Sequence, residues 1–385
     1  MAYHKEESFC FLRRKYWEES VGKTLEFSFN GIGGAAQAMS PAALPSGHNH
    51  KGFFWRALIN LLLIGFLFGF VALYSFLLGS SNGLIGLTIA MAMISFYRTD
   101  IGIKPLQGAC VIWGVFLLTG VATFLASFHP AIGVFVNLAS VYIILMLTSH
   151  QPMAKAYYPI LSCYLFAQSS HVYGAEYGLR MIGIAGGGLL VAIVYYLRHR
   201  KVERRRSIAD IFRETHVCSL RTKFFIRLTA GLTIAMLIGD FYHVLKPAWI
   251  SFTVLSLMQP FMGESKKKIW CRIIGTLIGG ALFFVLFEWI VPAAWHPVLL
   301  LLTGYIYLFL HTYWIQQVFV TLNSLSGAMV FLQADVAFEM RILFVLIGVA
   351  IVVAIGLCAR LRLVDRIYAL VLKWKARIQK KTPID

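Results

Sequence analysis

The chain has 385 residues, of which 59% are hydrophobic and 14% charged, and its formal net charge is +18 at pH 7. Soluble domains contain roughly 45–50% apolar residues, so a mean hydropathy of +0.73 excludes a soluble globular protein. The cations gather between and after the apolar runs, as the positive-inside rule requires of cytoplasmic loops. We therefore expect membrane lipids around the chain and no nucleic-acid partner.

The N-terminal segment, residues 1–52, precedes the first apolar run. It has no signal-peptide pattern and loosens into a stretch rich in Gly, Ala, Pro and Ser from Gly31 to Gly47. We expect this segment to be flexible and cytoplasmic.

Apolar runs dominate the rest of the chain, and a helix of roughly 18–24 residues crosses a bilayer. They predict an all-α polytopic membrane protein with about twelve transmembrane helices. Two runs, 82–96 and 247–261, are short, and short spans at matching places in two halves are typical of helices around a transport site. The runs lie near 57–78, 82–96, 106–127, 131–148, 154–171, 178–197, 224–243, 247–261, 268–290, 296–311, 313–331 and 338–359.

Two basic segments lie outside these runs: a linker at residues 201–223 and a tail at residues 361–385. The opposite loops carry almost no Lys or Arg, so we expect both segments and both termini to be cytoplasmic. The tail has one apolar face at helical spacing. It predicts a helix that lies on the membrane surface or packs against another subunit, so a homo-oligomer is possible.

The two halves of the chain resemble each other, which predicts two parallel six-helix repeats at residues 53–200 and 224–360. Both repeats would enter the membrane in the same sense, because each has an even number of spans. Four matching pairs carry the comparison: Phe53–Arg56 with Phe224–Arg227, Phe128–Pro130 with Trp295–Pro297, Arg180 with Arg341, and Arg198–Arg200 with Arg360–Arg362.

Three arginines, Arg180, Arg272 and Arg341, lie in the first turns of predicted helices. A helix N-terminus favours an anion, and a guanidinium binds a carboxylate with two hydrogen bonds. The alternative is that these side chains reach lipid phosphates. Thr276 and three glycines follow Arg272; such small residues allow either a ligand or another helix to approach closely.

Other candidates for a transport path are aromatic or uncharged. Trp249 begins a span, as an aromatic anchor at the membrane interface does, or as a flat wall for an aromatic substrate. The eleventh run carries a polar face that includes Gln316 and Asn323, with Gln317 beside it, and the fifth run carries Tyr158 and Gln168. These faces would line a path or bond helices together.

Proton coupling would need a group that titrates near neutral pH, and histidine is the simplest choice. Several histidines lie near predicted span ends, where most of them are expected to be interfacial caps rather than proton relays. No nucleotide-binding, hydrolase or metal-ligand motif stands out, and the six cysteines are scattered. We therefore expect a protein that is not an enzyme and that uses no cofactor or metal. The histidines are His129, His171, His243, His296 and His311.

The region from residue 247 to residue 280 has a recognisable motif: Pro-x-Trp at a span start, a polar loop, then Arg-x-x-Gly-Thr-x-x-Gly. It resembles the FUSC family, named for fusaric acid resistance and related to aromatic acid exporters. The first half departs from the motif, with Asn82 and Gly83 in place of Pro-x-Trp and no arginine before Gly114. The motif residues are Pro247, Trp249, Gly263, Arg272, Gly275, Thr276 and Gly279.

The resemblance implies a six-span unit, often present twice, in bacterial inner-membrane exporters of aromatic acids or drugs. We expect a secondary transporter of organic carboxylates, aromatic ones in particular, or related toxic compounds, driven by the proton gradient. The alternatives are a passive anion channel and a membrane protein that acts on lipid or envelope components. The residues expected to bind the substrate are Arg272, Trp249, Thr276, Arg341, Arg180, Gln316 and Asn323.

Overall fold

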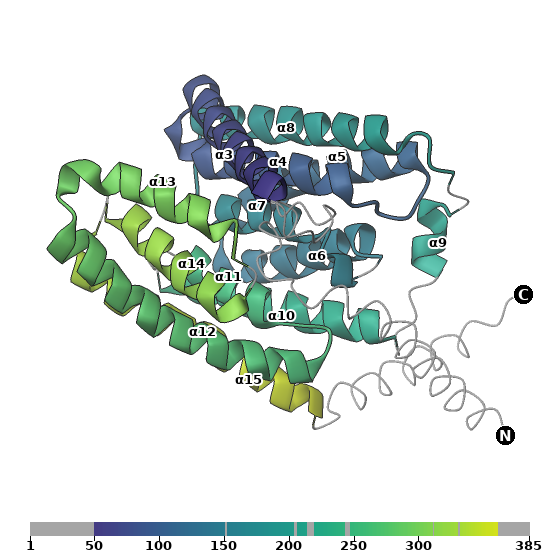
Figure 1. The fold of residues 1–385 in the computed structure, drawn as a ribbon. Helices are drawn as coiled ribbons and strands as arrows, with labels where there is room; N and C mark the ends of the chain where they lie inside the picture. The colour runs from purple at the N-terminus through teal and green to yellow at the C-terminus, as the bar shows by residue number, and fades with distance from the viewer. Residues whose placement is uncertain are drawn as a thin grey trace, which may run out of the picture.

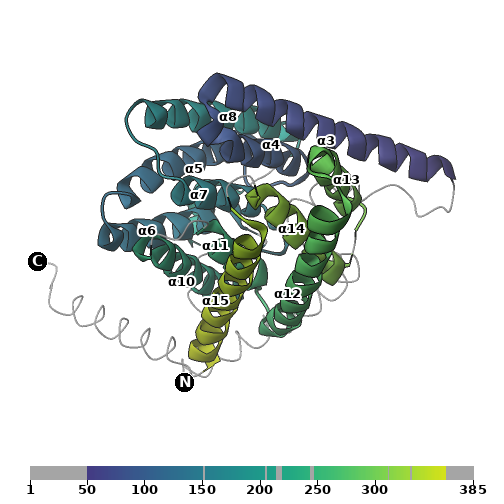
Figure 2. The same ribbon diagram turned by 90° about the vertical axis from the view of Figure 1, so that its left-hand side faces the viewer.

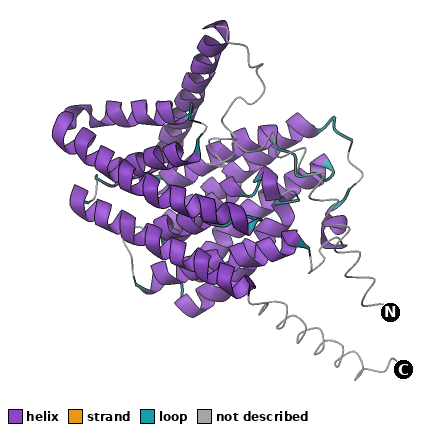
Figure 3. Ribbon diagram, turned by 60° about the horizontal axis from the view of Figure 1, so that its bottom comes forward, coloured by secondary structure: helices purple, strands orange, loops and turns teal. Residues whose placement is uncertain are grey.

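The computed structural model describes residues 50–360, apart from 151, 204–205, 214–218, 243–246, 311 and 330–331. Every element in this part of the chain is a helix (Figure 3), which confirms the all-α prediction. The N-terminal segment up to residue 49, the tail helix, His243 and His311 lie outside the described residues.

The first half forms a bundle of six helices (Figure 1). Three of them carry a proline in the first turn, where its missing N–H is not needed. The ring of His129 accepts a hydrogen bond from the backbone N–H of Ala131 at 3.1 Å and so caps the fourth of them. The six are α3 (His50–Leu78), α4 (Gly83–Arg98), α5 (Pro105–Ala126), α6 (Pro130–Thr148), α7 (Tyr158–Ser169) and α8 (Ala175–His199).

The second half follows a short helix, α9 (Ile208–Arg213), at one end of the bundle (Figure 1). Its first helix is capped by Ser219, whose hydroxyl accepts from the N–H of Thr222 at 3.1 Å. Its third helix continues as a π-helix over Phe284–Ile290. The helices are α10 (Leu220–Phe241), α11 (Ala248–Leu257), α12 (Met262–Phe283), α13 (His296–Tyr307), α14 (Tyr313–Ala328) and α15 (Ala334–Arg360).

Eight of the described helices are long and apolar enough to cross a membrane, which confirms a multi-pass membrane protein. The other four apolar helices, α7, α11, α13 and α14, have 12, 10, 12 and 16 residues. At 1.5 Å per residue they are shorter than a hydrocarbon core of about 30 Å. The count of twelve spans therefore stays a prediction.

Helix pairings recur in the two halves. α4 packs on α3 and α8, as α11 packs on α10 and α15; α5 packs on α7 and α8, as α12 packs on α14 and α15. The halves meet where α6 packs on α10 and where α3 packs on α13, and there the Tyr305 hydroxyl donates to the carbonyl of Ala57 at 3.1 Å. Two pairings differ within the described residues: α4 packs closely on α7 and α5 packs closely on α6, whereas neither α11 with α14 nor α12 with α13 makes a comparable contact.

A large apolar core joins both halves, and a smaller cluster around Phe283 and Phe287 lies between α12 and α14. Large apolar side chains also cover the outside: Phe76 on α3 is 86% exposed, and α3 runs along the edge of the bundle (Figure 2). An outer surface of this kind suits lipid rather than water.

Candidate anion-binding site

One face of α12 is buried along its length, and its chemistry changes from the start of the helix to its end. The buried residues recur every three or four positions, which keeps them on one side of an α-helix. The first part of this face is polar and cationic, and the last part is apolar. In chain order the face consists of Ser265, Lys268, Arg272, Gly275, Thr276, Gly279, Gly280 and Phe283.

The guanidinium of Arg272 lies between α11 and α14 and bridges them. The side chain is 3% exposed. Its Nη1 donates to Oε1 of Gln317, and its Nη2 lies 3.4 Å from Oγ1 of Thr253. Its Nε has no acceptor. One turn later, the hydroxyl of Thr276 donates to the Arg272 carbonyl at 2.8 Å, so Thr276 contacts the Arg272 backbone.

Arg341 approaches the same region from α15. It is 2% exposed, and its guanidinium carbon lies 4.9 Å from the centroid of the Trp249 ring, a cation–π arrangement. Its Nε has no acceptor. The positive charge of Arg272 acts on that of Arg341. Within the described residues, neither arginine forms an ion pair with an Asp or Glu.

Helix α11 contacts both arginines. Trp249 contacts Arg341, and Thr253, one turn later, contacts Arg272. The hydroxyl of Thr253 donates to the carbonyl of Trp249 at 2.8 Å, which fixes its oxygen as an acceptor toward Arg272. A short helix thus presents an aromatic ring and a hydroxyl to two buried cations.

Three tyrosines from three other helices lie within range of the charge of Arg272. Tyr158 begins α7, Tyr307 ends α13 and Tyr313 begins α14. Each is close enough for the charge of Arg272 to act on its hydroxyl. Tyrosine combines a flat apolar ring with a polar tip. The surroundings of Arg272 are therefore aromatic as well as polar.

The glycines after Arg272 hold α12 against α14. A Cβ atom on Gly279 would lie 2.5 Å from the carbonyl oxygen of Val318, and one on Gly275 would lie 2.6 Å from Cβ of Gln317. Gly280 faces the ring of Phe338 on α15. This close approach places the Gln317 amide within reach of Arg272.

Two predicted polar residues of α14 have other partners. Gln316 is buried, and its amide nitrogen donates to the carbonyl of Leu310 at 2.7 Å. Asn323 accepts from the hydroxyl of Thr303 at 2.6 Å, which ties α14 to α13. The structure therefore brings Arg272, Arg341, Trp249 and Thr276 into one region. Gln317, and not the predicted Gln316, contacts Arg272 there.

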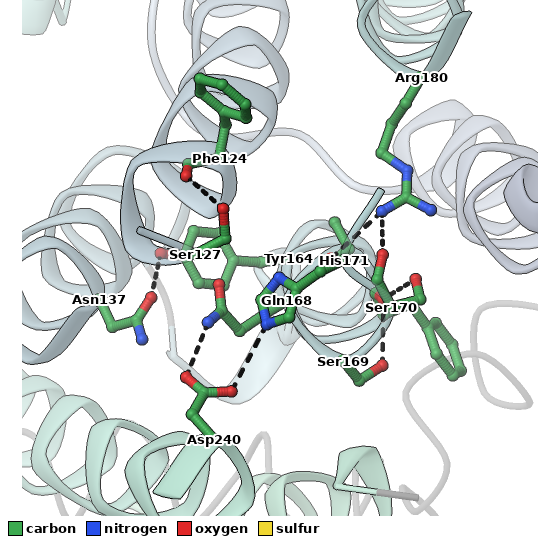
Figure 4. A network of polar contacts seen from close by, with 12 residues as sticks. Phe124, Ser127, Asn137, Tyr164, Gln168, Ser169, Ser170, His171, Arg180 and Asp240 are labelled. Atoms are coloured by element: carbon green, nitrogen blue, oxygen red, sulfur yellow. Dashed lines mark hydrogen bonds and ion pairs between the residues drawn. The ribbon is translucent and has the colours of Figure 1, made fainter. Parts of the chain in front are cut away.

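Arg180, the first-half counterpart of Arg341, has partners on every guanidinium nitrogen. Its Nε donates to Oδ1 of Asn82 at 2.8 Å, and its Nη2 donates to the carbonyl of Ser81 at 3.3 Å. Its Nη1 donates to the carbonyls of Ala167 and Ser170 (Figure 4). These bonds tie α8 to the start of α4 and to the end of α7.

The cationic face of α12 has no equivalent on α5. Both helices have 22 residues, and alignment from their first residues pairs Thr119 with Thr276. The hydroxyl of Thr119 donates to the carbonyl four residues earlier at 2.9 Å, as that of Thr276 does. The same alignment pairs Val111 and Val115 of α5 with Lys268 and Arg272 of α12.

A second polar network joins the halves at the other end of α7 (Figure 4). Asp240 on α10 accepts from the Gln168 amide at 3.0 Å and lies 3.7 Å from Nε2 of His171. Nearby, the hydroxyl of Tyr164 donates to Oδ1 of Asn137 at 2.6 Å. Asp240 is thus a half-buried acid between the first-half helix α7 and the second-half helix α10.

Sequence reasoning did not single out Thr253, Lys268, Tyr307 or Tyr313. A signal was present for two of them. Lys268 precedes Arg272 by four residues, the spacing of neighbours on one helix face, and Thr253 follows Trp249 at the same spacing. For the two tyrosines, which come from other helices, the sequence carries no comparable signal.

Comparison with known proteins gives one match. No curated protein and no solved structure matches the chain. Residues 234–355 match the family model described as fusaric acid resistance protein-like. The matched segment contains Trp249, Thr253, Arg272, Gln317 and Arg341, which confirms the resemblance read from residues 247–280. The chain is therefore similar to the fusaric acid resistance protein-like (FUSC) family over residues 234–355.

Proposed function

We propose that this protein is a membrane transporter that exports organic carboxylate anions, with its binding site between α11, α12, α14 and α15. The observation that carries the proposal is the pair of buried arginines, neither of which has a carboxylate partner among the described residues. A cation inside a membrane protein is costly and is usually kept for a function. A bound carboxylate would offset both the burial of Arg272 and Arg341 and the repulsion between them.

The hydrogen-bond acceptors of Arg272 in this structure are neutral side chains. Gln317 and Thr253 supply the oxygens that face Arg272. A carboxylate forms hydrogen bonds about twice as strong with a guanidinium as neutral acceptors do. Substrate binding would therefore replace the bridge between α11 and α14. A ligand that changes this bridge binds two arrangements of the helices unequally, as a carrier requires.

The rings around the site favour aromatic carboxylates. Trp249 stands against Arg341, and three tyrosines stand around Arg272. Offset stacking with such rings contributes about 0.5–1.5 kcal/mol beyond the area buried. The family name refers to resistance to an organic acid, which agrees with this choice of substrate.

We propose that the chain is built of two parallel six-helix repeats in a bacterial inner membrane, with both termini cytoplasmic. The shared helix pairings of the two halves support the repeat, as do the reciprocal contacts of α6 with α10 and of α13 with α3. In the alignment of α5 with α12, Val111 and Val115 occupy the positions of Lys268 and Arg272. We therefore expect one anion site per chain, in the second half.

Uptake into inverted membrane vesicles that contain the chain tests this function. Labelled 4-hydroxybenzoate should accumulate when the vesicles are energised, and a protonophore should abolish the accumulation. Uptake equal to that of vesicles without the protein would contradict the transport function. Uptake that ignores the protonophore would contradict proton driving, and single-channel currents in planar bilayers would then identify an anion channel.

A further inference from the structure

Three consecutive lysines at the start of α12 differ in their surroundings. Lys266 and Lys267 are exposed, whereas Lys268 is 9% exposed and lies on the same buried face as Arg272. Topology explains the first two, because lysines near a membrane surface extend their ammonium groups to the headgroups. Topology does not explain Lys268, whose side chain is directed toward the protein interior.

The ammonium of Lys268 lacks a carboxylate or hydrogen-bond partner among the described residues. Its Nζ lies 5.9 Å from the centroid of the Tyr313 ring. Glu264, one turn earlier, attracts it without forming an ion pair, and Lys155 repels it. The side chain of Lys268 is therefore largely buried, and its ammonium lies beside an aromatic ring.

Lys268 and Arg272 face one region. They are one turn apart on α12, a rise of about 6 Å. Tyr313 contacts Lys268 and also feels the charge of Arg272. An aromatic ligand beside Tyr313 would thus lie near both cations.

We propose that Lys268 is a second anion subsite, so that the preferred ligand is an aromatic acid with acidic groups on opposite sides of its ring. One group would bind Arg272 and the other Lys268, with the ring against Tyr313. This inference rests on the proposed transport function and specifies its substrate class. A ligand with one acidic group would leave Lys268 unpaired.

Hydrogen bonds to charged groups are strong enough for this subsite to be measurable, at roughly 10- to 100-fold in affinity. Isothermal titration of the full chain in neutral phosphatidylcholine nanodiscs, which contain no anionic lipid, provides the test. Terephthalate, with carboxylates at opposite ends of the ring, should bind 10- to 100-fold more tightly than benzoate. Phthalate, with adjacent carboxylates, should bind like benzoate.

The variant Lys268→Met should bring terephthalate to the affinity of benzoate and leave benzoate unchanged. Lys267→Met is the matched control, because it removes the same charge from the neighbouring exposed position, and it should keep the preference. Equal binding of terephthalate and benzoate by the unaltered chain would overturn the inference. So would an equal loss for both ligands in Lys268→Met, or the same effect in Lys267→Met.

Failure of the subsite can be told apart from failure of the proposed function. Benzoate binding that depends on Arg272 but shows no gain for terephthalate would contradict the second subsite alone. No binding of any of the three acids would contradict both. If Lys268 instead holds a lipid phosphate, phosphatidylglycerol added to the nanodiscs should bind the chain through Lys268, and the preference for terephthalate should be absent. That outcome also overturns the inference. If Lys268→Met does not fold, the comparison of ligands on the unaltered chain decides.

Discussion

Replacement of Arg272 by valine, the residue that α5 carries at the matching position, should lower kcat/KM for 4-hydroxybenzoate export by about 100-fold or more. The guanidinium would form two charge-assisted hydrogen bonds with the carboxylate, and each contributes roughly 1.5–3 kcal/mol. Arg272→Lys keeps the charge but loses the planar fork, so it should retain part of the activity. Initial rates in proteoliposomes at equal protein content measure both variants.

Arg198→Ala is the matched control for this experiment. Arg198 also lies near an aromatic ring, 5.1 Å from the centroid of Tyr97, but it is exposed at the end of α8. It should transport at the unaltered rate. Gel filtration must show that the Arg272 variants are folded and present in normal amount. Undiminished export by folded Arg272→Val would place the anion site elsewhere.

Gly279→Ala should lower the free energy of unfolding by about 1–3 kcal/mol, as an overpacked core does. The added Cβ would meet the backbone carbonyl of Val318 at 2.5 Å, and a backbone atom cannot turn aside as a side chain can. α14 would have to move away from α12 and carry Gln317 with it. The midpoint of thermal unfolding of the purified protein measures the loss, and transport should weaken with it.

Gly304→Ala on α13 controls for the substitution itself. A Cβ atom there has open space around it, and alanine favours a helix over glycine by roughly 1 kcal/mol. This variant should be as stable as the unaltered protein or slightly more stable. If both glycine variants behave alike, close contact between α12 and α14 does not limit stability.

The helices themselves could be predicted from sequence, because a bilayer demands long apolar runs and helices that satisfy their own backbone. Each predicted run contains a helix in the described residues. The lengths of α7 and α11 could not be predicted from the sequence in the same way. Their ends at Tyr158 and Leu257 depend on tertiary packing and turns, which hydropathy does not record.

The sequence also named Trp249, Arg272 and Arg341 as candidates for substrate binding, through the FUSC motif and the cations in the first turns of predicted helices. The structure instead places Arg272 in the middle of α12. The sequence placed Gln316 rather than Gln317 on the path. Adjacent helix residues point about 100° apart, so only the packing of α14 on α12 settles which of the two glutamines meets Arg272.

The sequence by itself determined an all-α membrane protein, because apolar length and charge position are local properties of the chain. The tertiary structure alone decided which partners each buried arginine has. Arg180 and Arg341 occupy matching positions. Arg180 donates hydrogen bonds to Asn82 and to backbone carbonyls, whereas Arg341 faces the ring of Trp249. Such partners come from helices distant in sequence, and only folding brings them together.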